Sequence, residues 1–356
     1  MRSSIITAMH YCVPENVLTN DVLEERFGQK ALKSIVKMAG ILERRVVRTG
    51  QTASDLAFWA AKRLMEDRQL DPGSIDLLIF ASQTGDYQIP ATACTLHNRL
   101  GLSDRCAAFD INLGCSSFPY SLSVANGMIC SRVARRALIL NADALTTVIH
   151  PKDRGLVPLH GDGAVASLLE PAPDDCGFDG FYLGTDGTGA EHLMIPASGA
   201  RNPRSEETRK ELLDDKGSVR TMEHLCMNGP AVFHFSVYKV PEVIRHALDA
   251  FGLTLEDIDL VLLHQANKMM LDLIYKALDV PANKQFLFME TVGNLSGAST
   301  PLVLCEAWRR GLIRGGSRTL LAAFGVGLSW GVTAIRWPTE LPSMVRGPVE
   351  PGDAQS

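Results

Sequence analysis

The sequence IDLLI at residues 75–79 recurs as IDLVL at residues 258–262, 183 positions further along the chain. RALIL at residues 136–140 is matched in the same way by RTLLA at residues 318–322, at an offset of 182. Each run is short, apolar and rich in branched residues, which is typical of buried strands in a parallel sheet. Because chance similarity between strands would rarely give nearly the same offset twice, we interpret these pairs as the sign of a duplicated half.

Helical patterns alternate with the strands, and this alternation predicts an α/β architecture. The predicted strands are 75–81, 107–112, 136–142, 258–263, 285–289 and 319–324, and the predicted helices are 52–67, 91–100, 117–130, 240–251, 268–278 and 300–311. A boundary near 171–180 divides the chain into an N-terminal half, residues 1–172, and a C-terminal half, residues 173–338. The charged stretch 201–225 is expected to be an irregular insertion, and the tail 339–356 is expected to be loosely held.

The composition excludes several classes of protein. With 356 residues, 46% of them hydrophobic and 21% charged, the chain is expected to fold around a large core. A net charge of −5 without a Lys/Arg run argues against nucleic-acid binding. Eight cysteines with no C-x-x-C spacing argue against a zinc module or a disulfide framework. With no signal peptide and no apolar stretch that could span a membrane, we expect a cytoplasmic protein.

Cys115 lies in DINLGCSSF, residues 110–118, where a predicted strand is followed by a predicted helix. The first turn of a helix offers free N–H groups and the positive end of the helix dipole, which stabilise a thiolate and lower the thiol pKa. Gly114 permits the sharp turn that presents the sulfur. The alternative interpretation is a buried cysteine that acts as a small hydrophobic residue. The setting makes Cys115 a candidate nucleophile.

His264 and Asn294 also follow predicted strands, and the carboxyl ends of strands border the active crevice in open α/β sheets. A structural histidine and a turn or helix-cap asparagine are the alternative interpretations. The duplication places Asn294 at the position equivalent to Cys115, 179 residues away. A pseudo-twofold relation between the halves would bring a thiol, an imidazole and an amide to one pocket.

Several short motifs occur in a fixed order along the chain. Besides residues 110–118 they are PATAC (90–94), GDGA (161–164), LGTDG (183–187), HQAN (264–267), GN (293–294) and FGVGLSWG (324–331). In this order they resemble the β-ketoacyl-acyl-carrier-protein synthase III group of the thiolase superfamily, over about residues 3–337. The resemblance implies a five-layered α-β-α-β-α fold made of two duplicated halves, a homodimer, and a catalytic set of Cys115, His264 and Asn294.

The resemblance also implies a mechanism. Cys115 would take an acyl group from a thioester, and a malonyl-type or β-ketoacyl thioester would then supply the carbanion for a Claisen condensation, in the malonyl case by losing CO₂. N–H groups of His264 and Asn294 would stabilise the enolate. The backbone N–H groups of Cys115 and Val326 would form a second oxyanion hole. The residues that the resemblance places along the substrate pocket are Ile89, Phe118, Gln265, Asn267 and Phe324.

Three positions depart from the family pattern. Ser34 stands where a tryptophan usually stacks on the coenzyme A adenine, Met269 replaces a usual arginine, and Ile89 replaces an aromatic residue of the acyl pocket. These changes favour a specialised enzyme of fatty-acid-like, polyketide or other secondary metabolism over initiation from acetyl-coenzyme A. The acyl thioester could come on coenzyme A or on an acyl carrier protein, and the cations expected to dock the carrier protein are Lys268, Lys276, Arg309 and Arg310. Ordinary solvated helix charges are the alternative interpretation.

Two other functional classes stay open. One is an acyltransferase that passes the acyl group from Cys115 to a hydroxyl, amine or thiol, with His264 as general base. The other is a non-catalytic partner subunit, against which the intact Cys, His and Asn set argues. Asn294 favours condensation, because simple acyl transfer needs no enolate-stabilising donor. The glycine-rich stretch 184–189 is interpreted as a turn, not a nucleotide site, and no metal or cofactor is expected.

Overall fold

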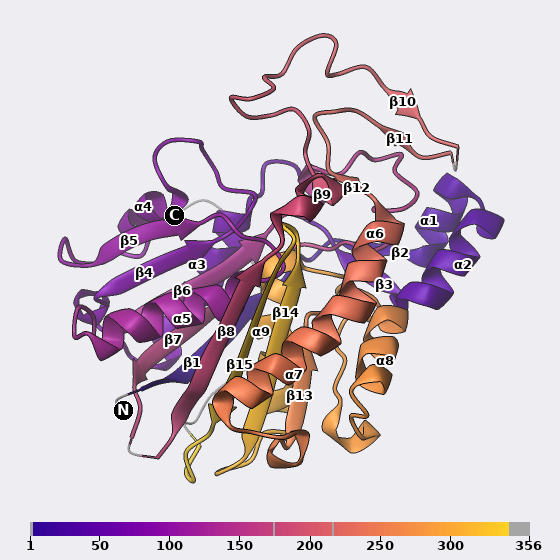
Figure 1. Ribbon diagram of the computed structural model, residues 1–356. Coiled ribbons are helices and arrows are strands. Elements are labelled where there is room, and N and C mark those ends of the chain that lie inside the picture. The colour runs from indigo at the N-terminus through magenta and orange to yellow at the C-terminus, as the bar shows by residue number, and fades with distance from the viewer. Residues whose placement is uncertain (1–2, 174, 216, 342–356) are drawn as a thin grey trace.

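The computed structural model describes residues 3–173, 175–215 and 217–341. Two sheets dominate it (Figure 1). The strands of the first sheet, in spatial order, are β1 (Ser4–Cys12), β7 (Gly163–Pro171), β6 (Ala137–Asp143), β4 (Leu77–Ala81) and β5 (Ala107–Ile111). The strands of the second, in the corresponding order, are β8 (Gly177–Thr185), β15 (Ser329–Arg336), β14 (Arg318–Gly325) and β13 (Leu260–Leu263).

The two sheets repeat one pattern of strand directions. β1, β7 and β6 are antiparallel neighbours, and so are β8, β15 and β14. β6 and β4 are parallel, and so are β14 and β13. The repeat agrees with two duplicated halves, and their division between residues 172 and 173 stays a prediction.

The predicted strand at 285–289 is wrong. Only a single parallel bridge, between Val261 and Gln285, forms where the second sheet would match β5. The N–H of Phe288 donates instead to the side-chain oxygen of Gln265 at 2.9 Å. Because a side chain takes this backbone donor, the segment does not continue the strand ladder.

The helices form three layers around the two sheets. α5 (Ser117–Cys130) and α9 (Ser299–Arg309) pack between the sheets, and their apolar side chains form one core with residues of both. α3 (Ala53–Asp67) and α4 (Thr92–Arg99) cover the outer face of the first sheet. α7 (Val240–Phe251) and α8 (Lys268–Ala277) cover the outer face of the second. The predicted five-layered α-β-α-β-α fold is confirmed, and the six predicted helices form with ends shifted by at most two residues.

Smaller elements flank the carboxyl ends of the strands. They are β2 (Val17–Thr19), α1 (Asn20–Phe27), α2 (Gln29–Ala39), β3 (Glu43–Arg45), β9 (Leu193–Met194), β12 (Cys226–Met227) and α6 (Gly229–His234). In the described part of the chain, no helix is both long and apolar enough to cross a membrane.

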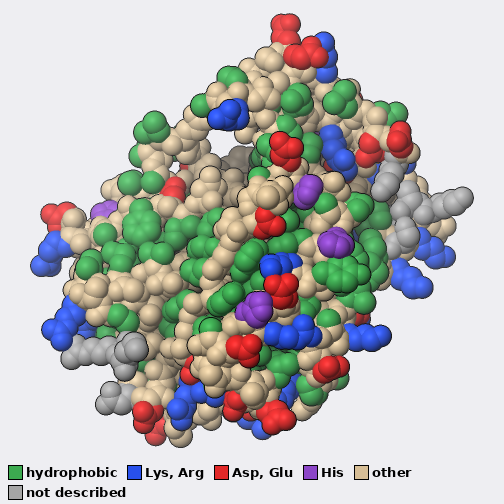
Figure 2. All heavy atoms as spheres, in the orientation of Figure 1, with side chains coloured by type: hydrophobic (Ala, Val, Ile, Leu, Met, Phe, Trp, Pro, Cys, Tyr) green, Lys and Arg blue, Asp and Glu red, His purple; other side chains and the backbone are tan. Residues whose placement is uncertain are grey.

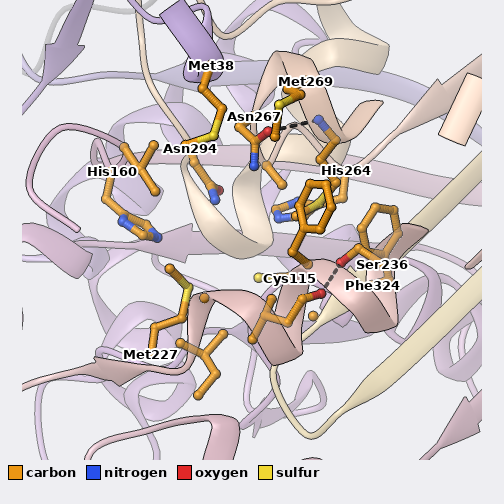
Figure 3. Close-up of a pocket in the computed structure, with 18 of the residues that line it drawn as sticks. Met38, Cys115, His160, Met227, Ser236, His264, Asn267, Met269, Asn294 and Phe324 are labelled. Carbon is orange, nitrogen blue, oxygen red and sulfur yellow. Dashed lines mark hydrogen bonds between the residues drawn. The ribbon is translucent and has the colours of Figure 1, made fainter. Parts of the chain in front are cut away.

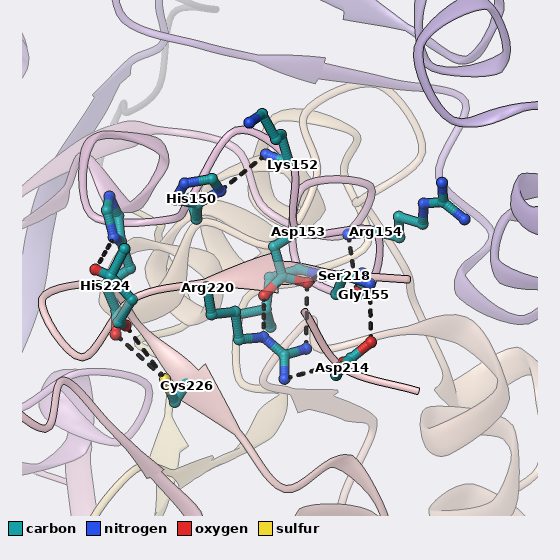
Figure 4. A network of polar contacts seen from close by, with 12 residues as sticks. His150, Lys152, Asp153, Arg154, Gly155, Asp214, Ser218, Arg220, His224 and Cys226 are labelled. Carbon is teal, nitrogen blue, oxygen red and sulfur yellow. Dashed lines mark hydrogen bonds and ion pairs between the residues drawn. The ribbon is translucent and has the colours of Figure 1, made fainter. Parts of the chain in front are cut away.

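The insertion predicted at 201–225 is largely irregular. It leaves the body after β9 and returns at β12. The regular structure among its described residues is the short pair β10 (Leu212–Leu213) and β11 (Val219–Arg220). A polar network fastens it to the body: Arg220 from β11 forms an ion pair with the buried Asp153 (Figure 4). Asp153 also accepts the N–H groups of Gly155 and Leu156 at 2.8 and 3.0 Å, which fixes the turn ahead of β7. The end of the tail, residues 342–356, lies outside the described residues.

Candidate active site

Side chains from both halves line one cavity of about 410 Å³. Cys115 precedes α5, His264 directly follows β13, and Asn294 lies in the loop ahead of α9. All three line the cavity, and Figure 3 shows the His264 and Asn294 side chains pointing toward the sulfur of Cys115 from one side. The structure thus brings the three predicted residues together at the carboxyl ends of the strands.

Cys115 is only partly exposed, and both apolar and polar groups lie around its sulfur. Burial raises the pKa of the thiol to about 11, and the nearby Asp143 raises it as well. The N–H groups of Val326 and of Cys115 itself, together with the Ser296 hydroxyl, hydrogen-bond to the sulfur and oppose the rise. The prediction of a lowered thiol pKa is wrong, because the loss of solvation exceeds what the helix start and its donors return. At neutral pH the group is therefore mainly the thiol.

This pKa predicts how the thiol reacts with an alkylating agent. Between pH 7 and pH 9 the rate of Cys115 alkylation by iodoacetamide should rise about tenfold per pH unit, because the thiolate fraction does so below the pKa. Ser296→Ala should raise the pKa further and slow the reaction at every pH in this range, since one thiolate donor is lost. Mass mapping of the Cys115 peptide measures the rate, with the exposed Cys94 as internal control. A rate that levels off near pH 7 would contradict the raised pKa.

Glycine at position 325 leaves room for the sulfur. A Cβ atom at this position would lie 2.8 Å from Cys115 Sγ, closer than real side chains approach. Gly325 and Phe324 both line the cavity, at the end of β14. The FGVGLSWG motif therefore supplies a wall of the site as well as the Val326 donor.

His264 is held as a neutral imidazole. Burial lowers its pKa to about 3, and repulsion from His160 acts in the same direction. Its ring packs edge-on against Phe324, with centroids 5.8 Å apart, and its Nδ1 has no hydrogen-bond partner. At neutral pH the ring therefore carries one N–H and one lone pair, and no partner at Nδ1 fixes which nitrogen bears the proton.

Asn294 is held by its side-chain oxygen. Oδ1 accepts the N–H of Ser296 at 2.9 Å and the hydroxyl of Ser299 at 3.2 Å. Its backbone N–H donates to Leu159 O at 2.9 Å, which ties the loop to the chain ahead of β7. The amide end faces the cavity (Figure 3), so the Nδ2 donor is the part left for a substrate. Asn294 is a turn-capping residue and a cavity donor at once.

Asp143 and Ser296 were missed by sequence reasoning. Asp143, at the end of β6, is buried and accepts the N–H of Gln83 at 2.8 Å and of Gly297 at 3.1 Å. The Ser296 hydroxyl interacts with both Asp143 and Cys115. A polar residue at the carboxyl end of a buried strand, the signal that selected His264, could have found Asp143.

The cavity is lined by some of the residues predicted for the substrate pocket and not by others. Asn267 and Phe324 line the cavity, and so does Met269. Ile89, Phe118 and Gln265 are not among its lining residues. Phe118 is fully buried in the core between the sheets, and Gln265 is turned away, with Nε2 donating to Leu263 O at 2.7 Å. Ile89 is 88% exposed, so in a single chain it cannot line an acyl pocket.

The predicted docking cations do not form a group at the cavity. Lys268 begins α8 beside Met269, whereas Lys276 lies in the last turn of that helix, more than 10 Å away at about 1.5 Å per residue. Arg309 and Arg310 end α9 and both bind the fully buried Glu306. One carboxylate balances only one of these two charges, and both side chains stay partly exposed, so docking at the two arginines stays a prediction. Of the four cations, Lys268 is next in sequence to the cavity residues Asn267 and Met269, and its exposed ammonium group pairs with Asp272 at 2.6 Å.

Most of the cavity wall is apolar. Its aliphatic, thioether and aromatic members are Met38, Leu159, Leu193, Met227, Pro230, Val232, Phe233, Ala266, Met269, Met270 and Phe324. None of its described lining residues is Lys, Arg, Asp or Glu. Met38 and Met269 are 38% and 36% exposed and mark the mouth, while His264 and Asn294 lie at the buried end. The side chain of Ser34 lies outside what the structure describes. No cluster of three or more His, Cys, Asp or Glu that could hold a metal occurs among the described residues.

Comparisons with known proteins agree with this geometry. Residues 109–187 match the family 3-oxoacyl-[acyl-carrier-protein] synthase III, and residues 248–337 match its C-terminal part. A β-ketoacyl-[acyl-carrier-protein] synthase III of Caldanaerobacter subterraneus is 38% identical over 91% of this chain and 95% of its own.

Solved structures are similar over nearly the whole chain. A 3-oxoacyl-(acyl-carrier-protein) synthase III superposes with a TM-score of 0.92 at 37% identity, covering 94% of this chain and 100% of the other. The priming β-ketosynthase of a polyketide biosynthetic pathway superposes with a TM-score of 0.83 at 29% identity, covering 95% and 97%. The resemblance inferred from the ordered motifs is confirmed.

Proposed function

This chain belongs to the 3-oxoacyl-[acyl-carrier-protein] synthase III family, and we propose that it is a β-ketoacyl synthase that forms a carbon–carbon bond by decarboxylative Claisen condensation. The observation that carries the proposal is the meeting of Cys115, His264 and Asn294 in one apolar cavity. The Cys115 nucleophile, the backbone N–H donors beside it and the side-chain N–H donors of His264 and Asn294 then surround the carbon atoms that react. Such donors act strongly where water is excluded.

The first half-reaction loads the enzyme. The Cys115 thiolate, a minor species at neutral pH, attacks the carbonyl carbon of an acyl thioester. The N–H groups of Cys115 and Val326, which lie at the sulfur, donate to the oxyanion that forms. Collapse of this intermediate breaks the carbon–sulfur bond of the donor thioester and leaves the acyl group on Cys115. The departing thiolate takes up the proton.

The second half-reaction makes the new bond. A malonyl-type thioester loses its carboxylate as CO₂, and the electron pair moves into an enolate. The Nδ2–H of Asn294 and an N–H of the neutral His264 donate to the enolate oxygen. The carbanion attacks the acyl carbonyl on Cys115, and the Cys115 thiolate leaves. A neutral imidazole suits this role, because it donates without protonating the carbanion.

The direct test adds the two substrates in turn. Intact-protein mass after an acyl thioester identifies the group on Cys115, and a malonyl thioester then reveals CO₂ and a β-ketoacyl product. An acyltransferase that passes the group to a hydroxyl, amine or thiol is the second candidate, and the lone pair of His264 would be its general base. Acyl transfer without CO₂ release would favour that candidate.

The apolar cavity supports a specialised role. A wall with four methionines and no charged side chain among its described residues adapts to varied acyl groups. The similarity to a polyketide priming ketosynthase points in the same direction. The proposed pathway is therefore fatty-acid-like or polyketide biosynthesis, in the cytoplasm.

The proposal includes a homodimer. Figure 2 shows hydrophobic side chains gathered over α5 and the edge strand β8. Val124 of α5 and Leu183 of β8 are 38% and 36% exposed, and Ile89 far more so. In the proposed homodimer, a second copy of the chain packs against these side chains and removes them from water.

Delivery by a carrier protein gives a separate prediction. Lys268→Glu should lower kcat/KM for a carrier-protein thioester about 3- to 10-fold at low salt, because a carrier protein is acidic, and leave the coenzyme A thioester of the same acyl group less affected. The effect should shrink with added salt. Lys276→Glu, at the other end of the same helix, is the matched control. Equal loss with both carriers would rule out docking at Lys268.

A further inference from the structure

A second histidine lines the cavity, and the mechanism above does not use it. His160 precedes β7, is 7% exposed, and pairs through a backbone bridge with Asn294. Figure 3 shows its ring directed into the cavity on the side opposite His264. Its low exposure, against 38% for Met38 and 36% for Met269, separates it from the mouth of the cavity.

The hydrogen bonds of His160 fix its tautomer. Nδ1 lies 3.1 Å from the backbone oxygen of Leu156, and a carbonyl oxygen can only accept, so Nδ1 carries the hydrogen. Burial lowers the pKa of the ring and keeps it neutral. Nε2 then has a lone pair and no hydrogen. The Leu156 turn is itself held by Asp153 and, through it, by Arg220 of the insertion (Figure 4).

No described side chain donates to this lone pair. The Ser236 hydroxyl donates to Val232 O at 2.8 Å, and the oxygen of Asn267 is taken by the N–H of Met270 at 2.9 Å. Asn294 offers a donor to the cavity, which suits an enolate oxygen, whereas His160 offers an acceptor, which an enolate would repel. His160 therefore suits a ligand group that donates a hydrogen bond.

We propose that His160 is a specificity-determining residue that selects acyl groups carrying a hydroxyl or an amide N–H. The inference rests on the proposed condensation and names the class of acyl group for it. When the acyl group is bound to Cys115, its O–H or N–H donates to His160 Nε2. A purely aliphatic acyl group would fill the cavity but leave a buried acceptor unpaired, and enzymes discriminate strongly on that ground.

The test compares matched acyl groups on one carrier, coenzyme A, so that the pantetheine arm is constant. Butyryl, 2-, 3- and 4-hydroxybutyryl and N-acetylglycyl thioesters are each measured for Cys115 acylation by intact mass and for condensation with malonyl thioester. At least one donor-bearing group should exceed butyryl about 10- to 100-fold in kcat/KM. The hydroxyl and amide arms show which donor fits.

Variants assign the preference to His160. His160→Phe keeps a ring but removes the acceptor, and the ratio of kcat/KM between the preferred group and butyryl should fall toward 1. His97→Phe replaces a histidine of α4, outside the cavity, and should keep the wild-type ratio. Thermal unfolding establishes that the variants are folded.

Two results would overturn the inference: a wild-type enzyme that gains nothing from any donor, or an unchanged ratio in His160→Phe. The first needs no variant and holds even if His160→Phe fails to fold. In both cases the wild-type enzyme would still condense the butyryl group with malonyl thioester. Failure of the proposed function is a different result, since no thioester in the panel would then acylate Cys115 or release CO₂ from malonyl thioester.

Discussion

Cys115→Ala is expected to abolish acylation and product formation, with a loss of at least about 10⁴-fold, as is typical when a covalent nucleophile is removed. Only the sulfur atom is lost, and it lies in a cavity instead of the close-packed core. The fold should therefore survive. Intact mass after incubation with acyl thioesters measures the acylation, and circular dichroism verifies the fold.

Cys94→Ala is the matched control, because this thiol is exposed on α4 and lines no wall of the cavity. It should keep wild-type acylation. Acyl mass that still appears on Cys115→Ala would mean that another side chain is the nucleophile.

Asn294→Ala and His264→Ala should each slow the release of CO₂ from malonyl thioester about 10²- to 10³-fold, while acylation of Cys115 is largely kept. The reason is that their N–H groups face the enolate, whereas the donors for the first oxyanion are backbone groups of Cys115 and Val326. Rapid-quench measurement of CO₂ from the acylated enzyme separates the two steps.

Asn294→Asp separates the donor from the structural role. Its carboxylate keeps an oxygen for the Ser296 N–H and the Ser299 hydroxyl but places no N–H toward the substrate. It should be as slow in CO₂ release as Asn294→Ala. If a variant released CO₂ at the wild-type rate, the enolate role of the residue it replaces would be refuted. If variants of both Asn294 and His264 did so, the acyltransferase would become the better proposal.

Regular patterns made much of the fold predictable. Apolar strands and 3.6-residue helices are local features, and the common offset related the two halves before any contact was known. The same logic selected Cys115 and His264, because each follows a strand at the carboxyl edge of its sheet. Asn294 was selected because it follows the predicted strand 285–289, which does not form, although the residue does reach the cavity. The strand at 285–289 failed because Gln265, distant in sequence, takes the N–H of Phe288.

Properties that depend on distant neighbours were not predictable. The pKa of Cys115 is set by how much apolar surface surrounds the sulfur, and part of that surface comes from Phe324, some 200 residues away. From the sequence alone, Arg309 and Arg310 were interpreted as free surface cations. The structure shows that both form ion pairs with the buried Glu306. His160 follows no predicted strand, and only the shape of the cavity singles it out.

The wall around Cys115 has a consequence for the newly made chain. The sulfur belongs to the half that is synthesised first, while Gly325, Phe324 and His264, which enclose it, belong to the half synthesised last. Until the second half docks, these groups do not cover the thiol, so its pKa is not raised by their burial and it forms thiolate more readily than in the finished enzyme. We therefore expect Cys115 to be more open to oxidation in the nascent chain than in the folded protein.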